Sequence, residues 1–147
     1  MRRIVIATDG SPDAMIAVHE GVELAHELDA AVTFVCVPTL PISMFAEPLP
    51  HALDEELARA RDAVQEAMAV AIDADVHAGY EIIDGAPVDA VLDVARNLDA
   101  WLIVVGSRGR GAVHGVLFGS VSRALVAHAD RPVLVARERA PLAAAAA

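Results

Sequence analysis

The chain contains no lysine, and all eleven of its basic residues are arginine. This absence excludes the Walker-type phosphate loop, in which a lysine contacts the β- and γ-phosphates of a nucleotide. Any phosphate site must therefore use backbone N–H groups, arginines, hydroxyls or a metal ion. Acidic residues number 21, which gives a formal net charge of −10. That charge disfavours binding to nucleic acid or to an anionic membrane, because both require a basic face.

Cysteine and long apolar runs are equally scarce. Cys36 is the only cysteine, so no disulfide can form within the chain, and a cytoplasmic location fits. No apolar run approaches the roughly 20 residues that span a bilayer. The short apolar run after Arg3 is typical of a first strand and not of a signal peptide. We expect one domain over residues 1–138 and an alanine-rich, disordered tail over 139–147.

Glycine is concentrated in one place, since five of the nine glycines fall between Gly106 and Gly119. An apolar run over 101–105 precedes this stretch, and a helical pattern over 120–128 follows it. Glycines allow the main chain to approach a ligand and to adopt positive φ. The N–H groups at the start of a helix attract anions. The stretch therefore predicts a phosphate cradle, which suggests a nucleotide-binding protein.

Apolar runs alternate with helical patterns along the rest of the chain. We predict strands over 3–8, 31–37, 76–83, 101–105 and 131–136, and helices over 12–28, 52–72, 87–97 and 120–128. This alternation is typical of an α/β fold in which helices cover both faces of a parallel sheet. Such sheets bind ligands at the carboxyl ends of their strands, where Asp9, Val37 and Gly106 fall. The segment over 38–51 is either a loop that folds over a site or a plain connector.

Several side chains have both a structural and a functional interpretation. Ser120 is either the N-cap of the last helix or a phosphate contact, and one hydroxyl can serve both roles. Arg108 and Arg110 are either solvated or phosphate partners, and Asp9 either forms a turn or belongs to the site. His114 is interpreted as a surface residue, Cys36 as buried and inert, and 54–56 as the charged first turn of a helix. We therefore predict no catalytic residue.

The glycine spacing resembles the motif of the ATP-binding members of the universal stress protein family. That motif is Gly, two residues, Gly, nine residues, then Gly and Ser or Thr, which matches Gly106, Gly109, Gly119 and Ser120. The segments 9–11 and 131–133 also resemble the family, and the resemblance covers about residues 1–137. It implies a three-layer α/β/α sandwich like that of the adenine nucleotide alpha hydrolases. The implied sheet has five parallel strands in the order 3-2-1-4-5, and the implied assembly is a homodimer formed through the last strand.

The resemblance also implies which residues bind the nucleotide. Ala7, Thr8 and Asp9 would lie beside the nucleoside, and Asp9 would be near the ribose or a metal. Val37 would offer backbone hydrogen bonds to the adenine edge. Val105 would also contact the nucleotide. The phosphates would be lined by Gly106, Arg108 and Gly109, and N–H groups and hydroxyls would come from Gly119, Ser120, Val121 and Ser122. The implied ligand is ATP or another adenine nucleotide, with Mg²⁺.

Three functions follow from these expectations. The first, which we prefer, is an ATP-binding regulatory module of the stress response. The second is a slow Mg²⁺-dependent ATP hydrolase or phosphotransferase. The third is a dimeric scaffold that binds a protein partner. The intact glycine motif argues against the third, and the lack of a visible general base argues against efficient turnover in the second.

Overall fold

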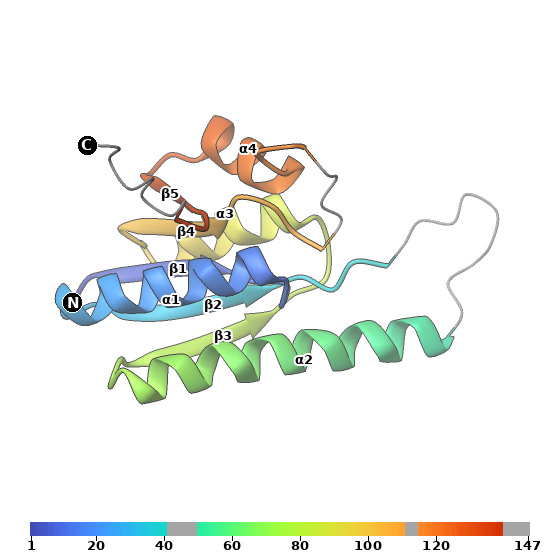
Figure 1. Ribbon diagram of the computed structural model, residues 1–147, viewed down its shortest axis with the longest axis horizontal. Helices are drawn as coiled ribbons and strands as arrows, with labels where there is room; N and C mark the ends of the chain where they lie inside the picture. The colour runs from blue at the N-terminus through green and yellow to red at the C-terminus, as the bar shows by residue number, and fades with distance from the viewer. Residues whose placement is uncertain (41–49, 111–114, 140–147) are drawn as a thin grey trace, which may run out of the picture.

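The computed structural model describes residues 1–40, 50–110 and 115–139. Strands and helices alternate as β1 (Arg3–Ala7), α1 (Pro12–Glu27), β2 (Ala31–Cys36), α2 (Pro50–Asp73), β3 (Ala78–Ile82), α3 (Pro87–Asn97), β4 (Leu102–Gly106), α4 (Ser120–His128) and β5 (Val133–Ala136). All strand pairs are parallel, and the sheet order is β3-β2-β1-β4-β5 (Figure 1). The predicted α/β class, three-layer architecture and strand order are confirmed.

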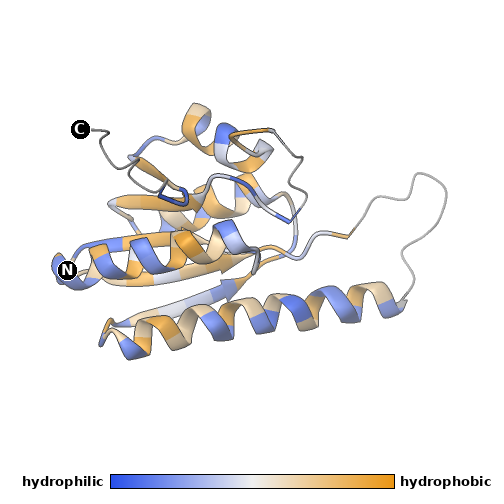
Figure 2. Cartoon of the chain, viewed as in Figure 1, coloured by the Kyte–Doolittle hydropathy of each residue, from blue (hydrophilic) through white to orange (hydrophobic). Residues whose placement is uncertain are grey.

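The central strand β1 shows why the sheet needs helices on both faces. Ile4, Val5 and Ile6 are consecutive and all 0% exposed, although neighbouring residues of a strand point to opposite faces. Ile4 and Ile6 pack in a cluster with apolar residues of α1 and α2, whereas Val5 packs in a second cluster with residues of α3 and α4. The strands are accordingly coloured as apolar in Figure 2, except for the edge strand β3, which is mostly exposed.

Three of the helices end in the same way, with an aspartate in the left-handed conformation. Asp29, Asp75 and Asp99 follow α1, α2 and α3 with φ of 50°, 55° and 48°. In each case the N–H of the next residue donates to the carbonyl five residues earlier, as Ala30 does to Ala25 at 2.9 Å. This pattern is the Schellman motif, in which glycine is the usual left-handed residue. The aspartates turn the chain toward the next strand at a cost in backbone strain.

Some predicted boundaries were wrong, and the reasons are local. The third strand begins at Ala78, because Val76 still bonds back to Ala71 at the end of α2. The last strand begins at Val133, because Arg131 instead donates two hydrogen bonds of 2.7 Å to the carbonyls of Ala95 and Ala100. The fourth strand runs over Leu102–Gly106, so the first motif glycine is part of the sheet.

The second helix begins at Pro50, two residues before the predicted start. The expectations for His114, for most of the 38–51 segment and for the tail from residue 140 lie outside the described residues. Within the described residues, no helix is both long enough and apolar enough to cross a membrane.

Candidate functional site

The glycine loop between β4 and α4 is closed by hydrogen bonds at its base. Gly119 N donates to Ser107 O at 2.6 Å, and Ser122 Oγ donates to the same carbonyl at 2.9 Å. Ser122 is only 2% exposed, and its hydroxyl lies 3.1 Å from Gly119 O as well. The start of α4 is thus fixed against the end of β4. The hydroxyl of Ser122, expected at the phosphates, is engaged within the protein.

Gly106 and Gly109 of the motif serve close packing and not positive φ. A Cβ on Gly106 would lie 2.6 Å from Asp13 O, and one on Gly109 would lie 2.7 Å from Asp9 Oδ2. Gly119 has φ of −76°, and Gly115 is the one glycine in the described part of this loop with positive φ, at 86°. The expectation of positive φ was therefore wrong for Gly106, Gly109 and Gly119. The lack of a side chain at Gly106 lets β4 approach α1, and its lack at Gly109 lets the loop approach Asp9.

The first turn of α4 offers backbone N–H groups to a ligand. Its N-cap is Gly119, which has no side chain to cap it, and Ser120 is the first helical residue. The interpretation of Ser120 as N-cap was therefore wrong. No described residue accepts a hydrogen bond from the N–H groups of Ser120, Val121 or Ser122. Such N–H groups, together with the helix dipole, form an anion site.

Asp9, at the end of β1, joins two segments at once. Its Oδ1 accepts a 2.9 Å hydrogen bond from Ser11 N, which forms the turn into α1. Its Oδ2 accepts a 2.9 Å hydrogen bond from Arg110 N in the glycine loop. Thr8 is buried, and its Oγ1 accepts from Gly10 N at 3.3 Å. Asp9 therefore makes the turn contact expected of Asp-Gly and also holds the glycine loop beside β1.

Both loop arginines are paired with carboxylates from the α1–α2 layer. Arg108 Nε lies 2.9 Å from Asp13 Oδ2, which also accepts from Ser107 Oγ at 3.1 Å. These contacts, the one with Arg108 above all, lower the pKa of Asp13. Arg110 binds Glu56 through both terminal nitrogens, at 2.9 and 2.8 Å. Neither guanidinium is simply solvated, because each is paired with a carboxylate of the protein.

Glu56 was missed by the sequence interpretation. The 54–56 segment was expected to be the first turn of a helix, but α2 begins at Pro50 and has no acidic residue in its first turn. Glu56 is 4% exposed, and its hydrogen bonds to Arg110 hold its pKa at about 2. One signal was available in the sequence. Glu56 lies four and seven residues before Ala60 and Ala63, which are buried on the same face of α2.

The residues expected around the nucleoside lie at the ends of β1, β2 and β4. Ala7 and Val37 are partly buried, and both pack in the cluster of Val5 and Val105 on the α3 side of the sheet. Hydrogen bonds between described residues leave the backbone N–H and C=O of Val37 unused. On the α2 side, burial raises the pKa of the Cys36 thiol to about 11. Cys36 is accordingly a protonated core residue, as predicted.

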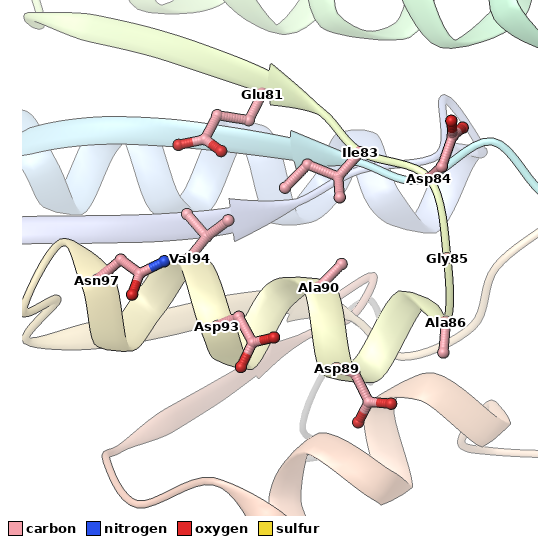
Figure 3. Close-up of a pocket in the computed structure, with 10 residues that line it drawn as sticks. All are labelled: Glu81, Ile83, Asp84, Gly85, Ala86, Asp89, Ala90, Asp93, Val94 and Asn97. Atoms are coloured by element: carbon pink, nitrogen blue, oxygen red, sulfur yellow. The ribbon is translucent and has the colours of Figure 1, made fainter.

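Two hollows lie near the carboxyl ends of the strands. One, of about 550 Å³, is bounded by the start of α1, by α2 and by the loop residues Gly109 and Arg110. The other, of about 340 Å³, lies between the end of β3 and α3 (Figure 3). Its lining includes Glu81, Asp84 and Asp89, so it would repel phosphate. In the described parts of the chain, no three His, Cys, Asp or Glu side chains are grouped to hold a metal ion.

The architecture defines a doubly wound α/β protein with an uncapped helix start at its topological switch point. Strands β1 and β4 are neighbours, and their crossovers leave the sheet on opposite faces (Figure 1). The crevice between the loops that follow them is where open α/β sheets bind ligands. The loop over 106–119 and the first turn of α4 form one side of that crevice.

Comparison with known proteins identifies the family. The model of the universal stress protein family matches residues 1–137, so the chain belongs to this family. A universal stress protein of Thermus aquaticus is 35% identical over 92% of this chain and 98% of the relative. The solved structure of UspA from Lactobacillus plantarum is 30% identical, with a TM-score of 0.80 over 92% of this chain and 97% of that one. A universal stress protein solved in complex with cAMP is 27% identical, with a TM-score of 0.71, and the match covers 94% of this chain and 98% of that one.

Proposed function

We propose that this protein binds an adenine nucleotide at the switch point of its sheet and acts as a nucleotide-dependent regulatory module of the stress response. The observation that carries this proposal is the uncapped start of α4, held beside the glycine loop. The N–H groups of Ser120, Val121 and Ser122 would bind the phosphates, with the Ser120 hydroxyl beside them. The solved relative with cAMP supports an adenine nucleotide as the ligand.

The nucleoside would lie over the ends of β1 and β2. Val37 has a free backbone N–H and C=O among the described residues, and these match the donor and acceptor on an adenine edge. Ala7, Thr8 and Asp9 would lie beneath the ribose, whereas Val105, Gly106, Arg108 and Gly109 would lie below the phosphates. No basic side chain needs to touch the phosphates in this arrangement, because backbone N–H groups and the helix dipole supply the positive potential.

ATP with Mg²⁺ is the ligand that the glycine motif favours. Mg²⁺ usually binds through phosphate oxygens and water with one or two carboxylates, so the site does not require a protein cage. Asp9 accepts a hydrogen bond from the main chain of the glycine loop and would be the protein ligand. The cation would offset repulsion between the triphosphate and the three carboxylates Asp9, Asp13 and Glu56.

A homodimer formed through the last strand is part of the proposal. Strand β5 is at an edge of the sheet, and Leu134 in it is 39% exposed. Val126 on the adjoining helix α4 is 58% exposed. An edge strand with exposed apolar residues favours pairing with a second copy. Sedimentation should give a dimer, and Leu134→Arg should give a monomer. A monomeric unmodified protein at high concentration would contradict this part.

A cytoplasmic location is also proposed, consistent with the lone thiol.

Nucleotide binding is tested directly on the purified protein. The protein is denatured, released small molecules are identified by mass spectrometry, and nucleotide-free protein is titrated with MgATP, AMP and cAMP. Gly119→Val should block binding, because it places a branched side chain at the N-cap of α4, beside the proposed phosphate site. Gly79→Val is the matched control, since a Cβ on Gly79 meets nothing within 4 Å. If no adenine nucleotide is released and none binds, the proposal fails.

Phosphate release measured in the same samples distinguishes regulation from turnover. A regulatory module should bind MgATP without steady hydrolysis. Steady release of phosphate that disappears in Asp9→Ala would favour the slow hydrolase instead, with Asp9 acting near the metal or the attacking water.

A further inference from the structure

The bond between Glu56 and Arg110 links two parts of the chain that are 54 residues apart. Arg110 Nη1 donates to Glu56 Oε2 at 2.9 Å, and Arg110 Nη2 donates to Glu56 Oε1 at 2.8 Å. This two-point geometry is the strong form of an arginine–carboxylate pair. Arg59, one turn further along α2, donates a third bond to Glu56 Oε1 at 2.7 Å. The carboxylate is thus fully committed to two guanidinium groups.

The ion pair matters for the glycine loop because Arg110 is a residue of that loop. Its backbone N–H donates to Asp9 Oδ2 at 2.9 Å, so the residue is held by its main chain at the end of β1. Its side chain reaches Glu56 in α2. Helices α2 and α4 pack on opposite faces of the sheet (Figure 1). Arg110 therefore spans the switch-point end of the sheet from the glycine loop to α2.

The burial of Glu56 makes the ion pair costly to open. Glu56 is 4% exposed, and a buried charge that loses its partner pays most of its desolvation penalty. A loop tied by such a contact does not sample other conformations freely, and a preorganised loop binds its ligand more tightly because less ordering entropy is lost on binding.

We propose that Glu56 is a positioning residue for the nucleotide site: by binding Arg110, it holds residues 108–110 over the strand ends without touching the nucleotide. In this arrangement Glu56 acts through Arg110, and Arg110 makes no phosphate contact. The effect on affinity depends on the nucleotide binding proposed above, whereas the effect on the loop does not. In the opposing arrangement, Arg110 contacts a phosphate directly, and Glu56 competes with the phosphate for Arg110.

Limited trypsin digestion tests the loop without any nucleotide. The chain contains no lysine, so trypsin can cut only after arginines, and Arg108 and Arg110 lie within the loop. Glu56→Gln should speed cleavage after these two residues by about tenfold, because local opening becomes easier. Arg59→Met is the matched control, since it removes the other guanidinium from the same carboxylate and leaves the loop contact; its cleavage rate should stay unchanged. An unchanged rate in Glu56→Gln, or an equal increase at Arg123 and Arg96, would overturn the proposal.

Nucleotide affinity provides the second readout. Glu56→Gln and Arg110→Met should each weaken AMP and MgATP by the same factor, about three- to tenfold, as expected from a loss of loop preorganisation. The double variant should lose no more than either single variant, because both remove the same interaction. A gain of affinity in Glu56→Gln, or a loss in Arg110→Met that grows with the number of phosphates, would instead establish direct phosphate contact.

The two proposals fail in distinguishable ways. If the unmodified protein binds no adenine nucleotide, the proposed function fails, and the trypsin rates still decide whether Glu56 holds the loop. If Glu56→Gln does not fold, Arg110→Met carries the test, because Glu56 keeps its bond to Arg59 in that variant. The rate of cleavage after Arg108 is then measured, because Arg110→Met removes the second cleavage site of the loop.

Discussion

Ser122 Oγ donates a 2.9 Å hydrogen bond to the carbonyl of Ser107, and this contact joins the first turn of α4 to the end of β4. Ser122 is buried, whereas Ser120, two residues earlier and on another side of the same helix, is exposed. The two serines therefore have separate roles. The hydroxyl of Ser122 holds the glycine loop closed, whereas the hydroxyl of Ser120 makes no hydrogen bond to another described residue.

We predict that Ser122→Ala mainly lowers the stability of the fold, whereas Ser120→Ala mainly weakens nucleotide binding. Ser122→Ala should lower the free energy of unfolding by about 1 kcal/mol through loss of a buried hydrogen bond. Ser120→Ala should leave stability within about 0.5 kcal/mol of the unmodified protein and should weaken nucleotide binding. Both substitutions raise the helix propensity by a similar amount. The difference in unfolding free energy between the two variants therefore measures the contribution of the Ser122 hydroxyl. Urea unfolding and calorimetric titration measure the two quantities. Equal stability of the two variants would contradict the division of roles.

Gly106 should be intolerant of any side chain, for a reason internal to the fold. A Cβ there would lie 2.6 Å from Asp13 O and 2.9 Å from Ala14 N, which are backbone atoms of α1. Gly106→Ala should cost roughly 1–3 kcal/mol, because β4 and α1 would have to separate. Gly79→Ala in β3 is the control and should be neutral or slightly stabilising, since nothing lies within 4 Å of the added atom. Chemical denaturation of the two variants, without nucleotide, provides the measurement. Equal unfolding free energies for Gly106→Ala and Gly79→Ala would mean that α1 moves away from β4 at little cost.

The ion pairs of Glu56 predict a specific dependence of stability on pH. Its pKa in the folded protein is about 2, below the ordinary value of 4.5. Folding therefore gains from the ionised form, and this contribution is complete above pH 4.5 and is lost as the pH falls toward 2. In Glu56→Gln this contribution is absent, so the two proteins should differ in stability at pH 6 and converge between pH 4.5 and 2. Unfolding free energies at several pH values test this. A constant difference across that range would show that ionisation of Glu56 is not the cause.

The strands of the sheet could be predicted from the sequence, because short stretches of sequence are enough to identify each strand and its ends. The apolar run at 3–7 and the turn at Asp9-Gly10-Ser11 identify a strand, its end and the start of α1, where Ser11 Oγ accepts from Ala14 N at 3.2 Å. The glycine loop followed from the concentration of glycines between a strand and a helix, whereas the strand order was implied by the family resemblance and was confirmed. The residues assigned to the nucleotide stay a prediction.

The partners of the loop could not be predicted, because they come from distant parts of the chain. The pairs Arg108–Asp13 and Arg110–Glu56 join residues that are 95 and 54 positions apart. No spacing rule links them, and each carboxylate has an adequate local interpretation as part of a helical first turn. The roles of Gly106 and Gly109 were hidden for the same reason. The atoms that a Cβ would meet belong to α1 and to Asp9, which only the folded sheet brings near.

The left-handed aspartates offer a final prediction, that the protein can be stabilised at three helix ends. Asp29, Asp75 and Asp99 hold positive φ, which glycine adopts without strain, and a carboxylate is also unfavourable at the negative end of a helix dipole. Replacing each by glycine should add about 0.5–1 kcal/mol. The gains should be additive, because the three sites are on separate helices. Asp84→Gly, in the turn after β3, is the control, since Asp84 has no positive φ. Thermal and urea unfolding of the single and triple variants would measure the effect, and a destabilised triple variant would mean that the aspartate side chains make contacts that outweigh the strain.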